Sequence, residues 1–521
     1  MLVDAKTDTM AELSLVVLPA ALAVTFCVLP MFRKTFGGVI QVLVSKTINY
    51  YLLWKYPISS FSSNRKLPTC CYQWPNGQGD VAKFLEGESN SAQWGNKYGR
   101  VYRIWNGLTG EVVLRDPIDI QTVFKDSDKH VKAINNHAGW LMGQLLGQCV
   151  GLISGPRYKN LRSATNAAFT QTQASTYMDL IATAVKNHFE TLAEGCLKRN
   201  RINPVADLRF LPFHIMACII YGPLSQNLQH DLEGLIELRE SLWQRMMQGG
   251  IVRYSWGRHL LPTVSKNLVE FKRRWAKFNN DAQAHAAKLA TTRRVPILDW
   301  YDTVESGDIT HEELLQTIDE MLFANLDVTM GGLSWILLFL AANPTVQGDI
   351  RHEMTGLFKE ASNEEMNNYI QRSSTLLAAS ALESSRLKPL AAFSVPQSAP
   401  TDRVVGGYTM PAGTHFIVDT HALNVENPYW GFDSDQYRPS RFLEKKPSEM
   451  RYHFWRFGFG PRQCQGKHVV DLIIRCIIAQ LLENYDLELD DDTCWEKNPS
   501  TWILHPNTEI KCWERRTKLR D

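Results

Sequence analysis

The sequence predicts a mainly α-helical fold, with one large helical domain and a smaller β-rich region behind an N-terminal transmembrane helix. Three observations predict it. A charge-free apolar run lies near the N-terminus, apolar and polar residues alternate on both sides of a turn near residue 107, and helical periodicity then continues to about residue 385. Since no internal repeat interrupts the chain, we expect a single compact domain beyond the apolar run.

The composition argues against several classes of protein. The 521 residues carry a formal net charge of +2, with 44% hydrophobic and 21% charged residues, as in ordinary globular proteins. This balance gives no reason to expect a nucleic-acid partner. The ten cysteines include no C-x-x-C pair, and no set of four Cys or His residues clusters as a zinc site requires.

Residues 13–32 are predicted to form the membrane anchor. This stretch contains no charge, and at about 1.5 Å per residue it spans a hydrocarbon core of about 30 Å. Arg33 and Lys34 follow it, which predicts that the bulk of the chain is cytosolic and that a short N-terminus at 1–12 is lumenal, as in a single-pass protein of the endoplasmic reticulum. A cleaved signal peptide is the alternative, but the segment before the run is acidic rather than basic.

Residues 33–90 are predicted to be a membrane-proximal segment and linker. Its apolar part, residues 36–58, carries Lys46 and Lys55, so it fits the membrane surface better than the membrane interior. Residues 67–80 are rich in turn formers and predict a linker. The catalytic domain is then expected at 91–521.

The longest helical pattern covers residues 311–344. Thr310 and Glu313 form a predicted capping box at its start, and Pro344 marks its end. The second half is apolar on all sides, so we expect this helix to pass through the middle of the fold.

The stretch FGFGPRQCQG, residues 457–466, surrounds one cysteine with glycines. Gly458, Gly460 and Gly466 allow the backbone to approach a planar cofactor closely, and Arg462 supplies a cation for an acidic group. Cys464 directly precedes a long apolar helix, whose dipole is expected to lower the pKa of the thiol. These features predict a thiolate that binds iron.

At this stretch the chain resembles the cytochrome P450 family. The family's haem signature F-x-x-G-x-R-x-C-x-G is matched at each fixed position, by Phe457, Gly460, Arg462, Cys464 and Gly466. The resemblance implies the cytochrome P450 fold. It also implies haem b as the cofactor, with Cys464 as the axial ligand of the iron.

Further motifs follow in the family's order. Glu383 and Arg386 lie three residues apart on one helical face, a spacing that by itself is typical of a solvated surface ion pair. The resemblance instead implies that they form, with Arg441, a buried triad that braces the haem loop. It also implies that Arg162 contacts a haem propionate, with Tyr158 where that helix usually has tryptophan.

The resemblance implies a haem-thiolate monooxygenase that uses O2 and electrons from NADPH. The chain has no flavin or nicotinamide fingerprint, so NADPH-cytochrome P450 reductase is the implied electron donor, with cytochrome b5 as a further candidate. Basic residues around the cysteine loop predict the docking surface, although they also suit an ordinary solvated face. These residues are Lys445, Lys446, Arg451, Arg456 and Lys467.

The central helix departs from the family pattern. Where the family usually has a glycine that opens the oxygen groove and a threonine that helps to protonate oxygen, this chain has Asn325 and Val328. Asp327 is retained. Either the substrate or water replaces the missing hydroxyl, or Asn325 and Thr329, one helical turn apart, replace the missing pair together.

The implied substrate is a lipophilic small molecule. The anchor and overall pattern resemble fungal enzymes of specialised metabolism, and the ANLDVT variant resembles enzymes that act on cyclic dipeptides or other amino-acid-derived scaffolds. A member that catalyses coupling, desaturation or ring formation without oxygen insertion is the first alternative, and Val328 favours it. A non-enzymatic haem-binding sensor is the second.

Overall fold

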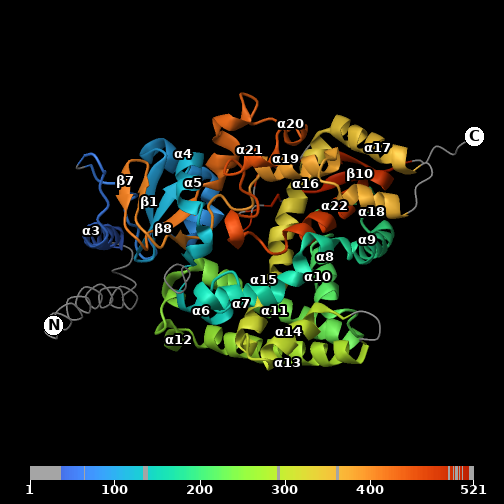
Figure 1. Cartoon of the computed structure of the whole chain (residues 1–521), viewed down its shortest axis with the longest axis horizontal. Coiled ribbons are helices and arrows are strands. Elements are labelled where there is room, and N and C mark those ends of the chain that lie inside the picture. Colours follow the sequence, from blue (N-terminus) through green and yellow to red (C-terminus); the bar gives the residue numbers. More distant parts are fainter. Residues whose placement is uncertain are drawn as a thin grey trace, which may run out of the picture.

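The computed structural model describes residues 37–515 except for 64, 133–138, 290–293, 359–362 and several positions between 491 and 507. The predicted anchor and lumenal N-terminus lie outside the described residues. In Figure 1 a β-rich region with α3 (Gly37–Lys55) lies on the left, and a larger helical region fills the middle, right and lower parts. The predicted division into a large helical part and a smaller β part is confirmed.

The β region is built on a five-stranded sheet in the order β1-β2-β8-β5-β3. A three-stranded sheet, β4-β10-β9, and a two-stranded sheet, β6-β7, complete the strands of the described residues. Their bounds are β1 Val101–Asn106, β2 Thr109–Leu114, β3 Val131–Lys132, β4 Arg201–Ile202, β5 Gln397–Ser398, β6 Arg403–Val405, β7 Tyr408–Met410, β8 His415–Val418, β9 Tyr485–Leu489 and β10 Ile510–Glu514.

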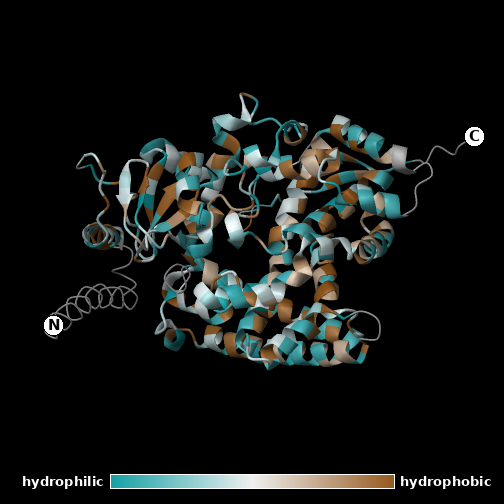
Figure 2. Ribbon diagram, viewed as in Figure 1, coloured by the Kyte–Doolittle hydropathy of each residue, from teal (hydrophilic) through white to brown (hydrophobic). Residues whose placement is uncertain are grey.

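The predicted hairpin is β1 paired antiparallel with β2, from Val101 opposite Leu114 to Asn106 opposite Thr109. Gly107 in the turn has φ +59°, a left-handed conformation that favours glycine. Apolar and polar residues are interspersed along β1, but all six of its residues are buried, so the polar ones do not face solvent. Figure 2 shows the hydrophobic residues gathered on these strands, and alternating hydrophobic and hydrophilic residues along the outer helix α13 (Pro262–Leu289).

Helices make up most of the remaining chain. Their bounds are α4 Gly87–Tyr98, α5 Pro117–Phe124, α6 Gly139–Leu146, α7 Gly155–Asn166, α8 Gln171–Ser175, α9 Met178–Ala193, α10 Leu211–Tyr221, α11 Gln226–Gln248, α12 Gly257–Leu260, α14 Pro296–Glu305, α15 His311–Ala324, α16 Met330–Ala342, α17 Pro344–Phe358, α18 Asn363–Gln371, α19 Leu376–Leu387, α20 Arg441–Glu444, α21 Pro447–Met450 and α22 Lys467–Asn484. Short 3-10 or π turns are η1 Val81–Leu85, η2 Ser127–Lys129, η3 Ala167–Phe169, η4 Leu197–Arg199, η5 Gly250–Arg253, η6 Asn325–Thr329, η7 Ala422–Glu426, η8 Pro428–Trp430 and η9 Gly460–Arg462.

The central helix consists of α15, the π turn η6 and α16, and it runs through the middle of the molecule (Figure 1). The capping box of Thr310 and Glu313 is present. The prediction of a long helix whose end is marked by Pro344 is confirmed, since the run ends at Ala342 and α17 begins at Pro344, but the sequence did not predict the π turn at 325–329. Among the described residues, the run His311–Ala342 alone is long and apolar enough to cross a membrane, but 78% of its most apolar window is buried in the protein.

A buried cluster of charges joins α19 to the segment that precedes the cysteine loop. Arg386 donates to both carboxylate oxygens of Glu383, at 2.8 and 2.9 Å, and Arg441 donates to one of them at 3.2 Å. All three side chains are fully buried, so Glu383 and Arg386 are not a solvated surface pair but part of the buried triad that the resemblance implies. Removing the carboxylate leaves the buried Arg386 guanidinium without its counter-charge, and it leaves Arg441 with Asp433, 3.0 Å away, as its remaining carboxylate partner.

We therefore expect Glu383→Gln to lower the free energy of unfolding by about 3–5 kcal/mol. Thermal and denaturant unfolding of the purified full chain measures this change. Glu270→Gln is the matched control, since Glu270 pairs with Arg273 at the same spacing but with side chains 43% and 64% exposed. Equal losses in the two variants would contradict a special role for the buried cluster.

Candidate active site

The loop that carries Cys464 has its backbone folded by local hydrogen bonds. The backbone N–H of Cys464 donates to the carbonyl of Phe457 at 2.9 Å, and the side-chain amide of Gln463 donates to the carbonyl of Gly458 at 3.1 Å. Gly458 and Gly460 have φ +84° and +68°, conformations that strain any side chain larger than glycine's. The glycines therefore make this tight loop possible.

Cys464 is exposed although the helix that follows, α22, is largely buried. Although part of its surface is accessible, the thiol has protein atoms on its other sides, and this burial raises its pKa, which the backbone N–H of Gly466 offsets only in part. The Gly466 N–H at the start of α22 acts in the expected direction, but burial outweighs it, so the net shift of the pKa in the protein without haem is upward. A thiolate at this position needs a cation bound directly to the sulfur, as a coordinating metal supplies.

Gly460 and Gly466 face different surroundings. A Cβ on Gly460 would lie 2.2 Å from the hydroxyl oxygen of Ser127, so the protein itself fills that side of the loop. A Cβ on Gly466 would meet no described atom closer than 3.9 Å. The space beside Gly466, two residues from the exposed Cys464, is thus left open by the protein.

Arg462 links the cysteine loop to the helical region. One terminal nitrogen donates to the carbonyl of Ile153 at 2.5 Å, and the guanidinium lies over the ring of Tyr158, 3.9 Å from its centroid. The hydroxyl of Tyr158 donates in turn to the carbonyl of Pro461 at 3.1 Å. The other terminal nitrogen of Arg462 is buried and has no hydrogen-bond partner among the described residues. Such an orphan donor calls for an acceptor from a ligand.

Positive charge gathers around this loop. Arg162 on α7 influences the pKa values of both Cys464 and Arg462, and burial with repulsion from Arg462 lowers the pKa of Lys132 to about 8. Glu320 on α15 opposes these cations, and burial raises its pKa. The surplus of half-buried cations, together with the orphan Arg462 nitrogen and the open side of Gly466, fits a planar cofactor with acidic groups.

Sequence reasoning missed a clamp between α15 and the loop at 148–151. The backbone N–H groups of Gln148, Val150 and Gly151 donate to the side chains of Gln316, Thr317 and Glu320 at 2.7, 3.1 and 3.0 Å. This clamp positions the segment whose Ile153 carbonyl holds Arg462. Polar residues at 316, 317 and 320 are ordinary on a helix, so no signal in the sequence identifies their partners.

The buried triad connects to the cysteine loop through Asn424. Arg386 donates to the carbonyl of Asn424 at 3.0 Å. The side chain of Asn424 exchanges two hydrogen bonds of 2.8 Å with the backbone of Trp455, two residues before Phe457. Sequence reasoning also missed Asn424, whose hydrogen bonds link the triad to the segment before the loop.

The structure brings Asn325 and Thr329 together but not Asp327. The amide of Asn325 donates to the carbonyl of Met321 and accepts from the hydroxyl of Thr329, both at 2.8 Å, and the two residues are 3% and 5% exposed. On the same turn Ala324 is exposed and Val328 is half-buried. The accessible side of the π turn therefore presents Ala324 and Val328, while Asn325 and Thr329 lie on the buried side.

Asp327 lies on another side of the turn. Its carboxylate is 3.7 Å from the guanidinium of Arg209, which also pairs with Glu240. Burial raises the pKa of Glu240, and Arg209 lowers it in part. Asp327 therefore belongs to a charge cluster between α11 and the central helix.

One residue of the predicted docking surface, Arg456, is paired and nearly buried. Arg456 pairs with Asp471 at 2.6 Å, and its side chain is only 11% exposed, so it adds little positive charge to the surface. Lys445 lies over the ring of Tyr429 and Lys467 donates to Gln463 at 2.9 Å, but neither has an ion pair in the described part of the chain.

Curated proteins of known family resemble this chain closely. It is 48% identical to the cytochrome P450 monooxygenase aclC of Aspergillus oryzae over 89% of this chain and 96% of that protein. It is 43% identical to the cytochrome P450 monooxygenase asaD of Aspergillus flavus over 93% of each chain. The cytochrome P450 monooxygenase gliC of Aspergillus fumigatus is 38% identical over 91% of this chain and 94% of its own.

The solved structures resemble it in fold. A zebrafish cytochrome P450 structure with progesterone superposes with a TM-score of 0.66 at 18% identity, covering 82% of this chain and 99% of that one. The family model for cytochrome P450 matches residues 82–512. The cysteine loop, the buried triad and the central helix lie within these residues, and the chain therefore belongs to the cytochrome P450 family, whose members hold a haem iron by a cysteine thiolate.

Proposed function

We propose that this cytochrome P450 monooxygenase is bound to the endoplasmic reticulum membrane and oxidises a lipophilic small molecule in fungal specialised metabolism. The observation that carries the activity is the exposed Cys464, held in a glycine-rich loop beside an unpaired Arg462 nitrogen. The predicted anchor at 13–32 supports the membrane location, and the fungal relatives support the metabolic setting.

The residues around Cys464 suit haem b. Cys464 would ligate the iron, Arg462 and Arg162 would offset the two acidic side chains of the macrocycle, and Gly466 would leave room for its ring. Tyr158 holds the loop and the Arg462 guanidinium in place. The triad of Glu383, Arg386 and Arg441 holds the segment that precedes the cysteine loop in a fixed position. When bound, thiolate-ligated haem supplies the reductive activation of dioxygen.

The proposed electron donor is NADPH-cytochrome P450 reductase, with cytochrome b5 as a second donor. Four of the five basic residues predicted to form the docking surface remain candidates: Lys445, Lys446, Arg451 and Lys467. An acidic partner surface would be attracted to them, with an on-rate that falls as salt rises.

The proposed substrate is amino-acid-derived, such as a cyclic dipeptide, and the ANLDVT turn supports this class by resemblance. Val328, on the accessible side of that turn, favours one alternative: coupling, desaturation or ring formation without oxygen insertion. A non-enzymatic haem sensor would need neither a reductase nor a substrate.

Reconstitution under ¹⁸O₂ tests the proposal. Membranes that contain the full chain, a reductase and NADPH are incubated with extract from a source strain that lacks the protein, and products are read by mass spectrometry. We expect a product that carries one ¹⁸O atom. An unlabelled product that still requires NADPH would establish the coupling or desaturation alternative. No product from protein with a thiolate-haem spectrum would contradict the proposal for that extract's metabolites.

Gly460 and Gly466 give a matched pair of predictions about the cofactor. Gly460→Ala should lower the free energy of unfolding by at least about 1–2 kcal/mol, because its φ is left-handed and the new Cβ meets Ser127. Gly466→Ala should leave the stability of the haem-free protein unchanged and lower the haem content.

Unfolding midpoints and the ratio of haem absorbance to protein absorbance measure these two effects. Gly413→Ala is the control for the cost of a left-handed backbone without a clash. Gly413 has φ +81°, and a Cβ added there would meet no atom within 4 Å among the described residues. Full haem content in Gly466→Ala would show that the cofactor does not occupy the space beside this glycine.

We propose that Asn325 and Thr329 hold the π turn in shape, while water or substrate delivers protons past Val328. Both side chains are buried, and the Thr329 hydroxyl already donates to Asn325. Thr329→Val should therefore change the ratio of product to hydrogen peroxide by less than about twofold, whereas Val328→Thr should raise it by more than that, because it places a hydroxyl on the accessible side.

Product and peroxide are measured together per NADPH consumed. Val328→Ala, which changes size without adding a hydroxyl, is the control for Val328→Thr. A fall of about tenfold in the ratio for Thr329→Val would instead establish joint proton delivery by Asn325 and Thr329.

A further inference from the structure

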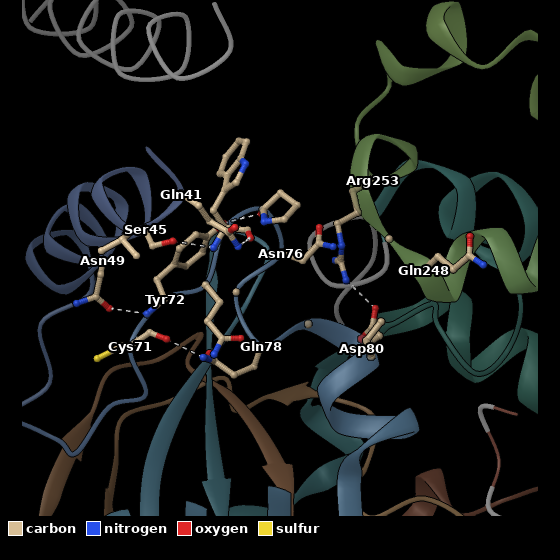
Figure 3. Close-up of a pocket in the computed structure, with 18 of the residues that line it drawn as sticks. Gln41, Ser45, Asn49, Cys71, Tyr72, Asn76, Gln78, Asp80, Gln248 and Arg253 are labelled. Atoms are coloured by element: carbon tan, nitrogen blue, oxygen red, sulfur yellow. Dashed lines mark hydrogen bonds and ion pairs between the residues drawn. The ribbon is translucent and has the colours of Figure 1, made fainter. Parts of the chain in front are cut away.

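A cavity lies between α3, the linker at 71–81 and the end of α11, and none of the cysteine loop's residues lines it. Its volume is about 780 Å³, which suits a ligand the size of a lipid head group with part of its chains. Figure 3 shows Gln41, Ser45 and Asn49 of α3 on one side and Gln248 and Arg253 on the other. The family's chemistry does not use these residues.

Arg253 is the unusual member of this cavity wall. Its side chain is only 5% exposed, and one terminal nitrogen donates to Asp80 at 2.7 Å. The remaining nitrogens, Nε and Nη1, are buried and have no hydrogen-bond partner among the described residues. Two unsatisfied donors on a buried guanidinium are costly, and an acceptor oxygen from a ligand would remove that cost.

The surrounding protein cannot easily supply that acceptor. Asp80 already accepts from Asn106 at 3.0 Å and lies 3.1 Å from Lys83, which is in turn 3.0 Å from Glu111. The two carboxylates therefore balance Lys83 and Arg253. Lys46 on α3 also lines the cavity and adds a further positive charge. The chemistry of the site favours an anion with several acceptor oxygens, such as a phosphate group.

The surface around the cavity indicates where such a group comes from. α3 exposes Val39, Val42, Leu43, Tyr50 and Trp54, all between 52% and 82%. Beyond the other wall, Trp256 and Leu260 are 50% and 62% exposed. In Figure 1 α3 and α12 lie on the same side of the molecule. Large exposed apolar residues on both sides of a cavity are typical of a membrane-facing surface.

We propose that this cavity binds a membrane phospholipid, whose phosphate lies against the guanidinium of Arg253 and the side chain of Lys46. Val42 lines the cavity and also belongs to the apolar surface, so the acyl chains would continue from the cavity along α3. This inference rests on the proposed membrane location.

Photolabelling of the full chain tests it. The chain, loaded with haem, is incorporated into phosphatidylcholine vesicles that contain a small fraction of a phospholipid with a diazirine beside its phosphate, irradiated, and digested for mass spectrometry. We expect labels on the cavity segments at 38–49, 71–81 and 247–253. Inorganic phosphate is added in a parallel sample as the competing source of the anion.

Two variants and a control test whether the labelling depends on the cavity. Arg253→Lys keeps the charge toward Asp80 but removes the two unpaired donors, and Val42→Trp fills the cavity mouth. Each should reduce labelling of the cavity segments by about tenfold. Val39→Trp is the matched control, because Val39 is exposed on the same helix and does not line the cavity. The cavity segments of Val39→Trp should be labelled to the same extent as those of the wild type.

Other outcomes overturn the inference. Labels spread evenly over α3 and α12, unchanged in Arg253→Lys and Val42→Trp, would show a general membrane contact without a lipid site. Complete protection by inorganic phosphate would make the free anion the occupant instead of a lipid. Flotation of the vesicles is measured in the same samples. A chain that does not float with them contradicts the proposed membrane location itself, whereas a chain that floats without a cavity label contradicts the lipid site alone.

Discussion

The active site depends on one buried carboxylate. Glu383 accepts from the guanidinium groups of Arg386 and Arg441 with all three side chains fully buried. Cations taken out of water are stable only if they are paired and their remaining donors are satisfied. The carboxylate of Asp433 is a second anion for Arg441, and the backbone carbonyls of Asn424 and Asp433 accept further hydrogen bonds from the two arginines. Both residues belong to the chain that leads to the cysteine loop. The geometry of that loop is therefore a consequence of charge burial elsewhere.

A second set of polar contacts joins the cysteine loop to the central helix. Three side chains of α15 hold the backbone at 148–151, the Ile153 carbonyl holds Arg462, and Tyr158 holds the carbonyl of Pro461. Each contact links segments more than a hundred residues apart. Because the loop is held from both directions, Cys464 is exposed at a defined position although its neighbours are packed.

Arg462 and Arg253 show the same physical situation in different places. Arg462 and Arg253 each keep one nitrogen bonded to the protein, while another is buried without a partner among the described residues. The first lies beside the cysteine loop and suits an acidic group of haem. The second lies in a cavity beside an apolar surface and suits the phosphate of a lipid. In both, the donors left over after folding indicate the acceptor that the protein lacks.

The sequence alone determined the family, the mainly helical fold, the hairpin at 101–114 and the capping box at Thr310. These depend on local spacing or on a contiguous motif, which a single segment contains in full. Arg462 and Cys464 could be named for the same reason. The helix N-terminus at Cys464 was also a local argument: its N–H lowers the pKa of the thiol, but burial outweighs this effect.

Only the tertiary structure decided which polar groups are buried and which partners they meet. Glu383 and Arg386 have the spacing of any surface pair, and Arg441 reaches them from 58 residues away. Asn424, Glu320 and Arg253 have no distinguishing pattern, since an asparagine, a glutamate or an arginine is ordinary at its place in the chain. Desolvation and hydrogen-bond satisfaction depend on atoms that the fold brings together from distant segments, so the chemical roles of these residues become visible only when the chain is packed.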